Sequence, residues 1–201
     1  MNEAGYSAIK NEDVLLIEAF NKGDQASFDK LVIKYKNKIF NLCFRFLNNY
    51  EEADDCAQEA FVKVFRSLSG FKFESSFSTW IYRVAVNTCK NKVLSSEFRQ
   101  RKKMIRIDSP ANDPKDGDRP LEIGDEKYSP RKAAQDAERS GFISEAIASL
   151  PDDQKQVIIL RDIEGLSYDE IATVTGFNLG TVKSRISRAR QTLCEMLRGR
   201  V

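Results

Sequence analysis

A stretch rich in proline, glycine and acidic residues separates two segments of the chain that carry helical periodicity. Residues 109–130 hold four of the five prolines, two glycines and few large apolar side chains. Burial of so few apolar groups does not offset the conformational entropy lost on ordering, and the composition is typical of an extended or disordered linker. The chain is therefore expected to be all-α, with two helical domains joined by a flexible linker.

Apolar side chains recur every three or four residues through the first half of the chain, which predicts four amphipathic helices. The first is a short helix that Asp13 caps and Gly23 ends, and a longer helix follows it. A third helix covers 53–68, and a fourth runs from about residue 78 to 95. The fourth helix is expected to face the core through Ile81, Val84, Ala85, Thr88 and Cys89, and to face outward through Arg83, Asn87, Lys90 and Asn91.

The second half of the chain contains the pattern of a helix-turn-helix unit. Ser167 and Glu170 form a capping box, Gly176 ends the short helix, and Asn178 caps a basic helix after a tight turn. The apolar spacing of the basic helix turns one face to the core. The remaining face is free to meet DNA through Thr181, Lys183, Ser184, Arg185, Arg188 and Arg190. A helical hairpin with a solvated basic face is the alternative interpretation.

Charge is unevenly distributed although the formal net charge is only +2. Residues 80–106 carry eight cations against one acid, residues 108–126 carry seven acids against two cations, and residues 178–201 carry six cations against one acid. Two basic blocks separated by an acidic one indicate two phosphate-facing modules joined by a segment that avoids nucleic acid.

Residues 71–91 combine aromatic and basic side chains, including the single tryptophan, Trp80. Aromatic rings beside cations suit the stacking of unpaired bases along a phosphate backbone. The same aromatic residues also suit a helical core, and taken alone they are more typical of packing.

Several classes of site are not supported by the composition. The chain has no histidine, and its four cysteines (Cys43, Cys56, Cys89 and Cys194) show no CxxC spacing, so no metal or cofactor is expected and buried free thiols are predicted. No catalytic constellation or phosphate-binding glycine loop is present, which argues against an enzyme and a small-molecule substrate. No apolar run is long enough for membrane insertion, and a cytoplasmic location is expected.

Four motifs resemble those of the extracytoplasmic-function sigma factors of bacterial RNA polymerase. They are ADDCAQEAFVKVF at 53–65, FSTWIYRVAVNTCKN at 77–91, LPDDQKQVIILRDIEGLSYDEIA at 150–172 and GTVKSRISRAR at 180–190. They occur in the order and spacing of that family. The resemblance implies a sigma region 2 domain over 1–98, a linker over 99–134 and a sigma region 4 domain over 135–201.

The resemblance also implies an alternative sigma factor that directs core RNA polymerase to specific promoters. Contacts to the clamp helices of the beta-prime subunit are implied for Asp55, Gln58, Glu59 and Phe61. Recognition and melting of the minus-ten element are implied for Phe71, Lys72, Ser75, Ser76, Phe77, Thr79, Trp80, Arg83, Asn87, Lys90 and Asn91. The six polar residues of the basic helix would recognise the minus-thirty-five element, and the same domain would lie on the beta flap.

Further implications concern partners and a departure from the family pattern. An anti-sigma factor is an expected partner beside polymerase and promoter DNA. Ile81 follows Trp80 where housekeeping members have a second tryptophan, so a two-tryptophan wedge is not available. Two alternatives remain at this point: a helix-turn-helix regulator that binds an operator without polymerase, and a helical adaptor whose basic faces bind acidic proteins.

Overall fold

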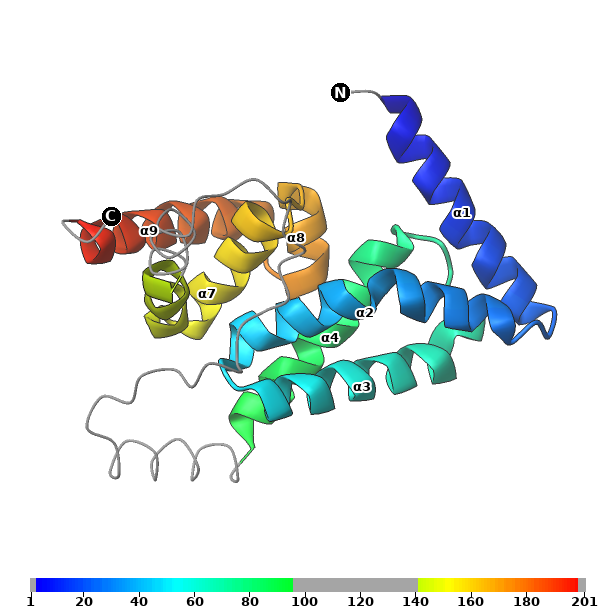
Figure 1. Cartoon of the computed structure of the whole chain (residues 1–201). Coiled ribbons are helices and arrows are strands. Elements are labelled where there is room, and N and C mark those ends of the chain that lie inside the picture. The colour runs from blue at the N-terminus through cyan, green and yellow to red at the C-terminus, as the bar shows by residue number, and fades with distance from the viewer. Residues whose placement is uncertain (1–2, 96–140, 199–201) are drawn as a thin grey trace, which may run out of the picture.

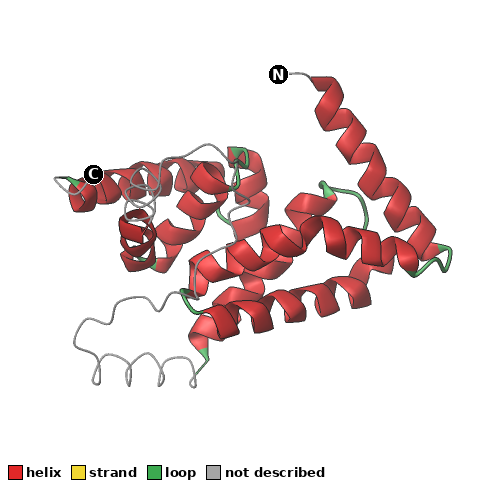
Figure 2. Ribbon diagram, in the orientation of Figure 1, coloured by secondary structure: helices red, strands yellow, loops and turns green. Residues whose placement is uncertain are grey.

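The computed structural model describes residues 3–95 and 141–198, with side chains from residue 12 onward, and these residues contain helices and no strands (Figure 2). The predicted linker, 99–134, lies outside the described residues. The first unit contains α1 (Glu3–Asn21), α2 (Ala26–Leu47), α3 (Tyr50–Ser67), the short 3₁₀ turn η1 (Leu68–Gly70) and α4 (Phe77–Leu94). The second contains a helical segment at 141–149, α7 (Asp152–Ile158), the π turn η2 (Ile159–Ile163), α8 (Tyr168–Thr175) and α9 (Leu179–Leu197).

The ends of these helices follow from local side-chain chemistry. Asn48 adopts the left-handed conformation (φ 51°) that ends α2, and the Asn49 side chain accepts a 2.9 Å hydrogen bond from the backbone N–H of Glu52 at the start of α3. Ser76 caps α4 in the same way, accepting from the N–H of Thr79 at 3.1 Å. The predicted start of the fourth helix is therefore correct to within one residue.

The core of the first unit lies between α2, α3 and α4, as the apolar spacing predicts. Leu31, Ile39 and Leu42 of α2 are buried against Val64 of α3 and Ile81 of α4. Complete burial of one such side chain stabilises the fold by about 1.5–3 kcal/mol relative to an exposed one. This packing holds α2 and α3 side by side, and α4 crosses behind them and contacts both (Figure 1).

The prediction that Asp13 begins a helix is wrong. The helix α1 runs through this position, and the Asp13 carboxylate points inward, where it is 6% exposed. It accepts hydrogen bonds of 2.6 Å from the Tyr35 hydroxyl and 2.6 Å from the Lys34 ammonium. Burial is the main reason why the pKa of Tyr35 is raised, and the hydrogen bond to Asp13 adds to the effect. Asp13 therefore ties α1 to α2 instead of capping a helix.

The two units also contact one another. In the first unit α4 packs on α2 and α3, and it packs in addition on α8 of the second unit (Figure 1). The Tyr82 hydroxyl donates a 2.7 Å hydrogen bond to Glu164, and the Thr79 hydroxyl donates a 3.3 Å hydrogen bond to Glu170. The predicted single inner stripe of α4 is thus incomplete, because Tyr82 and Val86 are buried on a second side of this helix.

Candidate nucleic-acid interface

The helix-turn-helix unit is formed by α8, a tight turn and α9. Ser167 accepts a hydrogen bond from the N–H of Glu170, and the Glu170 carboxylate accepts one from the N–H of Ser167, as the capping box predicts. Gly176 ends α8 at φ 76°, a conformation that favours glycine, and its N–H donates to Ala172. The Asn178 side chain then caps α9 by accepting from the N–H of Thr181 at 2.8 Å.

The α9 helix turns one face inward and presents the other to solvent. Val182, Ile186 and Ala189 are buried, and Leu193 is half-buried against the core. Of the six residues predicted to meet DNA, Lys183, Ser184, Arg188 and Arg190 are exposed, whereas Thr181 and Arg185 are half-buried. All six lie on one helix that packs on α7 and α8 and leaves its outer face to solvent, an arrangement that suits a major-groove recognition helix.

The cations of α9 differ in how strongly the protein itself holds them. Arg185 pairs with Asp153 (Nε to Oδ2, 3.1 Å), and its guanidinium lies 3.8 Å from the centre of the Phe177 ring. Arg190 pairs with Asp162 (Nε to Oδ2, 3.1 Å), and this hydrogen bond raises the pKa of Arg190. Across residues 12–95 and 141–198, Arg188 has no such ion pair, so it is the arginine most available to a ligand.

The aromatic residues that precede and begin α4 form one cluster of rings. The ring centres of Phe71 and Trp80 are 5.0 Å apart, those of Phe77 and Trp80 are 5.9 Å apart, and those of Phe71 and Phe73 are 4.9 Å apart. Phe77 is buried and also touches Tyr35, so it belongs to the core. Trp80 is half-buried, with one side on the cluster, which leaves part of its ring accessible.

Phe73 lies within the stretch 71–91 that the sequence predicts to stack bases, although it is not among the individually named candidate residues. Its side chain is 44% exposed and its backbone lies at φ 57°, an unusual conformation for a bulky residue. The sequence does indicate that Phe73 is exposed. It lies between Lys72 and Glu74 in a segment without helical periodicity, where a phenylalanine has no core to face. Phe73 therefore extends the exposed aromatic surface of the loop.

The other candidate residues of the loop and of α4 fall into two groups. Lys72, Arg83, Asn87 and Asn91 are exposed, as predicted for an outward face. Ser75, Ser76 and Lys90 are half-buried, and Thr79 is buried by its contacts with Ser76 and Glu170. The structure thus brings the predicted minus-ten residues onto one loop and one helix, but it leaves only part of the set accessible.

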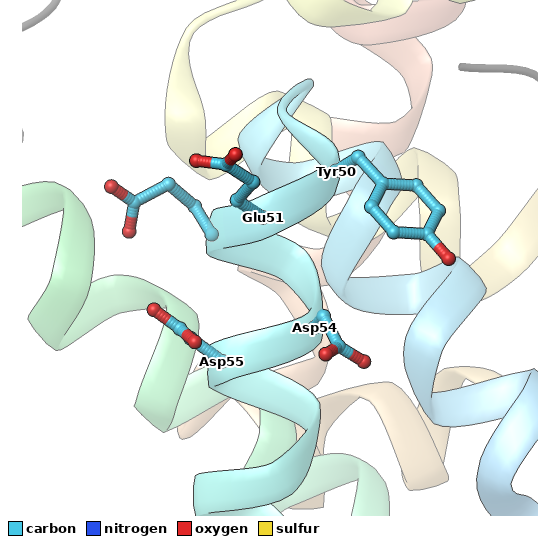
Figure 3. Close-up of a pocket in the computed structure, with 5 residues that line it drawn as sticks. Tyr50, Glu51, Asp54 and Asp55 are labelled. Atoms are coloured by element: carbon cyan, nitrogen blue, oxygen red, sulfur yellow. The ribbon is translucent and has the colours of Figure 1, made fainter. Parts of the chain in front are cut away.

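Of the four residues of α3 expected to contact polymerase, Asp55, Gln58 and Glu59 are exposed and Phe61 is half-buried, as is the neighbouring Asp54. The Gln58 amide donates to Asp54 at 2.8 Å, and Glu59 pairs with Lys63 at 2.7 Å. At the start of this helix a surface hollow of about 410 Å³ is lined by Tyr50, Glu51, Glu52, Asp54 and Asp55, whose acidic side chains are shown in Figure 3. The Asp55 carboxylate lies 4.0 Å from the Lys92 ammonium, and both Asp55 and Glu59 remain more than half exposed, so a basic partner surface can reach them in competition with Lys92 and Lys63.

The cysteines do not all lie where the sequence predicts. Cys43, Cys56 and Cys89 are buried, but Cys194 is exposed, because it lies beside the inward stripe of α9 and not on it. The Cys89 thiol donates hydrogen bonds to the neighbouring Cys43 and Cys56, and this is the main cause of the raised pKa of Cys89. Among the residues that the structure describes, no group of cysteine, aspartate or glutamate side chains has the arrangement of a metal site. In the same residues no helix is both long and apolar enough to cross a membrane.

Comparison with known proteins gives a consistent result for both units. The model of sigma-70 region 2 matches residues 31–102, and the model of sigma-70 region 4 matches residues 143–193. The RNA polymerase sigma-H factor of Pseudomonas aeruginosa is 40% identical over 94% of this chain and 95% of its own. The ECF RNA polymerase sigma-E factor of Escherichia coli K12 is 37% identical over 90% of this chain and 92% of its own.

Solved structures with the same fold include CnrH in complex with the cytosolic domain of CnrY, with a TM-score of 0.64 and 21% identity over 93% of this chain and 97% of that chain. Another is the sigma factor RpoE of Bartonella quintana in complex with the anti-sigma factor NepR, with a TM-score of 0.59 and 22% identity over 86% of this chain and 97% of that chain. At these identities the likeness concerns the fold.

These features define a transcription initiation factor that binds promoter DNA together with RNA polymerase. The chain belongs to the sigma-70 family, and its relatives make it an alternative sigma factor of the extracytoplasmic-function group. Members of this family direct polymerase to promoters and are not themselves catalysts. A regulator that binds an operator without polymerase is not favoured, because region 2 is present as well as region 4.

Proposed function

We propose that the two units divide promoter recognition between them. The exposed face of α9 reads the minus-thirty-five element, and the aromatic loop with α4 captures the minus-ten element. The observation that carries this proposal is the presence, in one chain, of an accessible basic recognition helix and a ring cluster beside Arg83 and Asn87. Stacking on aromatic rings offsets the loss of base stacking on opening by about 1–3 kcal/mol per base.

The division into domains forms part of the same proposal. Residues 1–98 act as the core-binding and promoter-melting domain, 99–134 as an acidic linker that threads toward the RNA exit path, and 135–201 as the minus-thirty-five domain. Tethering raises the effective concentration of the second domain at its site once the first is bound. Neither domain then needs high affinity alone, which lets the polymerase leave the promoter after initiation.

Core polymerase binds, in this proposal, through the acidic face of α3. Asp55 and Glu59 project from one side of the helix with Gln58 between them, and their side chains are 72% and 55% exposed. Such a row of carboxylates suits the basic surface of the clamp helices of beta-prime, and the second unit lies on the beta flap. Because its partner is the polymerase, the protein acts in the cytoplasm and does so without catalytic chemistry of its own.

An anti-sigma factor is the further partner that we propose. Solved structures with the same fold contain a sigma factor in complex with such an inhibitor or with a cytosolic partner domain. The inhibitor would cover the acidic face of α3 and the basic face of α9, and so compete with both polymerase and DNA. Stable, polymerase-competent protein in unstressed cells that lack any bound inhibitor would argue against this partner.

Retention of core polymerase tests the first part of the proposal. The double variant Asp55→Lys, Glu59→Lys should lose most of the polymerase that the wild-type chain retains. The double variant Glu18→Lys, Asp29→Lys is the matched control, since it reverses two exposed acids of the same unit and changes the net charge equally. If the wild type and the α3 variant retained equal amounts of polymerase, α3 would not be the surface that binds core polymerase.

Promoter opening tests the second part. Trp80→Ala and Asn87→Ala should reduce permanganate reactivity of the minus-ten thymines in the holoenzyme complex, with little change in duplex minus-thirty-five binding. Lys22→Ala, at an exposed position near the end of α1, serves as the control. If both variants impaired the two assays equally, the proposed division of labour would be wrong.

A further inference from the structure

The α4 helix also contacts the second unit, since it packs on α8. Tyr82 is 5% exposed and Val86 is 0% exposed, and they lie four residues apart on the same side of the helix. The Tyr82 hydroxyl donates to Glu164 at 2.7 Å, which joins α4 to the segment before α8. Burial, followed by the nearby Glu164 carboxylate, raises the pKa of Tyr82, so this phenol remains a donor at neutral pH.

Further along the same side, Phe177 lies between two cations from different units. The Lys90 ammonium of α4 is 5.6 Å from the centre of its ring, and the Arg185 guanidinium of α9 is 3.8 Å from it. Both distances fall within the range of a cation–π interaction. Phe177 occupies the turn between α8 and α9, so a residue of the helix-turn-helix turn holds a residue of the promoter-melting helix.

This contact uses residues that the proposed function assigns to DNA. Lys90 and Thr79 belong to the proposed minus-ten surface, and Arg185 belongs to the proposed minus-thirty-five surface. Thr79 is buried by its hydrogen bond to Glu170, and Lys90 and Arg185 are both half-buried. Thr79 is therefore covered, and Lys90 and Arg185 are partly covered, while the two units remain in contact.

The contact is also electrostatically poor. Burial, and then repulsion from Arg185, lowers the pKa of Lys90. Within the described residues, Arg185 Nη1 is buried and has no hydrogen-bond partner. An unsatisfied buried donor is costly, and so is a desolvated ammonium next to a second cation. We therefore expect the contact between the two units to break when a phosphate or a partner surface binds Lys90 and Arg185 more strongly.

We propose that the chain, when free of polymerase and DNA, is held in a closed form by a latch of Phe177, Lys90, Arg185 and the Tyr82–Glu164 hydrogen bond. The latch keeps part of each DNA surface covered until the units separate. This inference rests on the proposed function for the role of the two surfaces, but the closed form itself is independent of that role.

The distance between the two units in the full-length free chain shows whether the latch is closed or open. Spin labels on the exposed Cys194 of α9 and on an introduced cysteine, Lys36→Cys in α2, report this distance, because the three other cysteines are buried. Phe177→Leu keeps an apolar side chain but removes the ring, and Tyr82→Phe removes only the hydroxyl. Either change should raise the ratio of open to closed molecules about two- to thirtyfold.

Two control variants separate the latch from ordinary packing. Tyr168→Leu removes a ring that carries the Arg161 guanidinium at 4.8 Å entirely within the second unit. Tyr50→Phe removes a hydroxyl from a residue that is 47% exposed. Neither should change the distance distribution. A wild-type chain with a broad distribution, unaffected by Phe177→Leu and Tyr82→Phe, would overturn the latch.

The affinity of the free chain for a minus-thirty-five duplex shows whether the closed form covers the DNA-binding surface. Tyr82→Phe should strengthen this binding by the factor by which it raises the fraction of open molecules, although Tyr82 lies in the other unit. Opening without stronger binding would overturn the covering role. Absence of duplex binding in every variant of the free chain would also overturn the covering role. Failure of the holoenzyme to bind the minus-thirty-five duplex would contradict the proposed function instead, and the distance distributions would still decide whether the latch exists.

Discussion

Replacement of Arg188 by alanine is expected to weaken minus-thirty-five recognition far more than replacement of Arg190. Both arginines are exposed on α9, but the described part of the chain offers Arg188 no carboxylate, whereas Arg190 is held by Asp162. A guanidinium that forms two hydrogen bonds to a guanine edge contributes about 1–3 kcal/mol of discrimination. Arg188→Ala should therefore reduce affinity for the specific duplex by about 5- to 150-fold.

The expected loss for Arg190→Ala is smaller because Arg190 must first leave Asp162. The Arg190 side chain is 52% exposed, and exposed ion pairs of this kind are worth about 0–1 kcal/mol. An arginine so held contributes to DNA binding mainly through a phosphate. Arg190→Ala should reduce affinity by less than about fivefold, and equally for specific and non-specific duplexes, with a smaller salt slope.

Fluorescence anisotropy of the holoenzyme on labelled duplexes at several salt concentrations measures both effects. Thermal unfolding of each variant checks that the loss does not come from misfolding. Equal losses for Arg188→Ala and Arg190→Ala would refute the reasoning from ion pairing. A loss for Arg188→Ala that is the same on specific and non-specific duplexes would show that Arg188 contacts the phosphate backbone and not a base.

Three further expectations concern stability and accessibility. Ser167→Ala removes half of the capping box and should lower the free energy of unfolding in urea by about 1 kcal/mol, whereas Ser187→Ala, at an exposed position of α9, should change it little. Because the pKa of Tyr82 is raised, its contribution to stability is full below the ordinary tyrosine pKa and is lost as pH rises above it. Wild-type stability should thus fall by about 1.4 kcal/mol per pH unit more than that of Tyr82→Phe above about pH 10.5, measured by urea unfolding. A thiol reagent should modify Cys194 quickly in the native chain and the other three cysteines only after unfolding, as mass spectrometry would show.

The family, the helical class and the limits of most helices are determined by local sequence patterns. Helix caps act through hydrogen bonds between residues three positions apart, so they can be predicted from the neighbouring sequence. Examples are Ser167 with Glu170, and Asn178 before α9. The three- and four-residue spacing of apolar side chains similarly shows which face of each helix is buried, because that spacing matches the turn of the helix.

Spacing alone does not show that a helix is buried on two sides or which polar groups are covered. The spacing predicts that Lys90 of α4 faces outward and leaves Tyr82 out of the inner stripe, but Lys90 lies against Phe177 and Tyr82 is bonded to Glu164. Asp13 has the sequence context of a helix cap, yet Tyr35 and Lys34 make it a buried acceptor inside α1. In each case the partner lies more than twenty residues away in the chain.

The candidate interface shows the same division. The sequence by itself determined that α9 is a basic recognition helix and that aromatic and basic residues meet near Trp80. The tertiary structure alone decided that Arg185 and Arg190 are held by Asp153 and Asp162, whereas no carboxylate of the described residues pairs with Arg188. The physical reason is that helix formation depends on contacts within one turn, whereas the availability of a side chain depends on which distant charge the fold brings beside it.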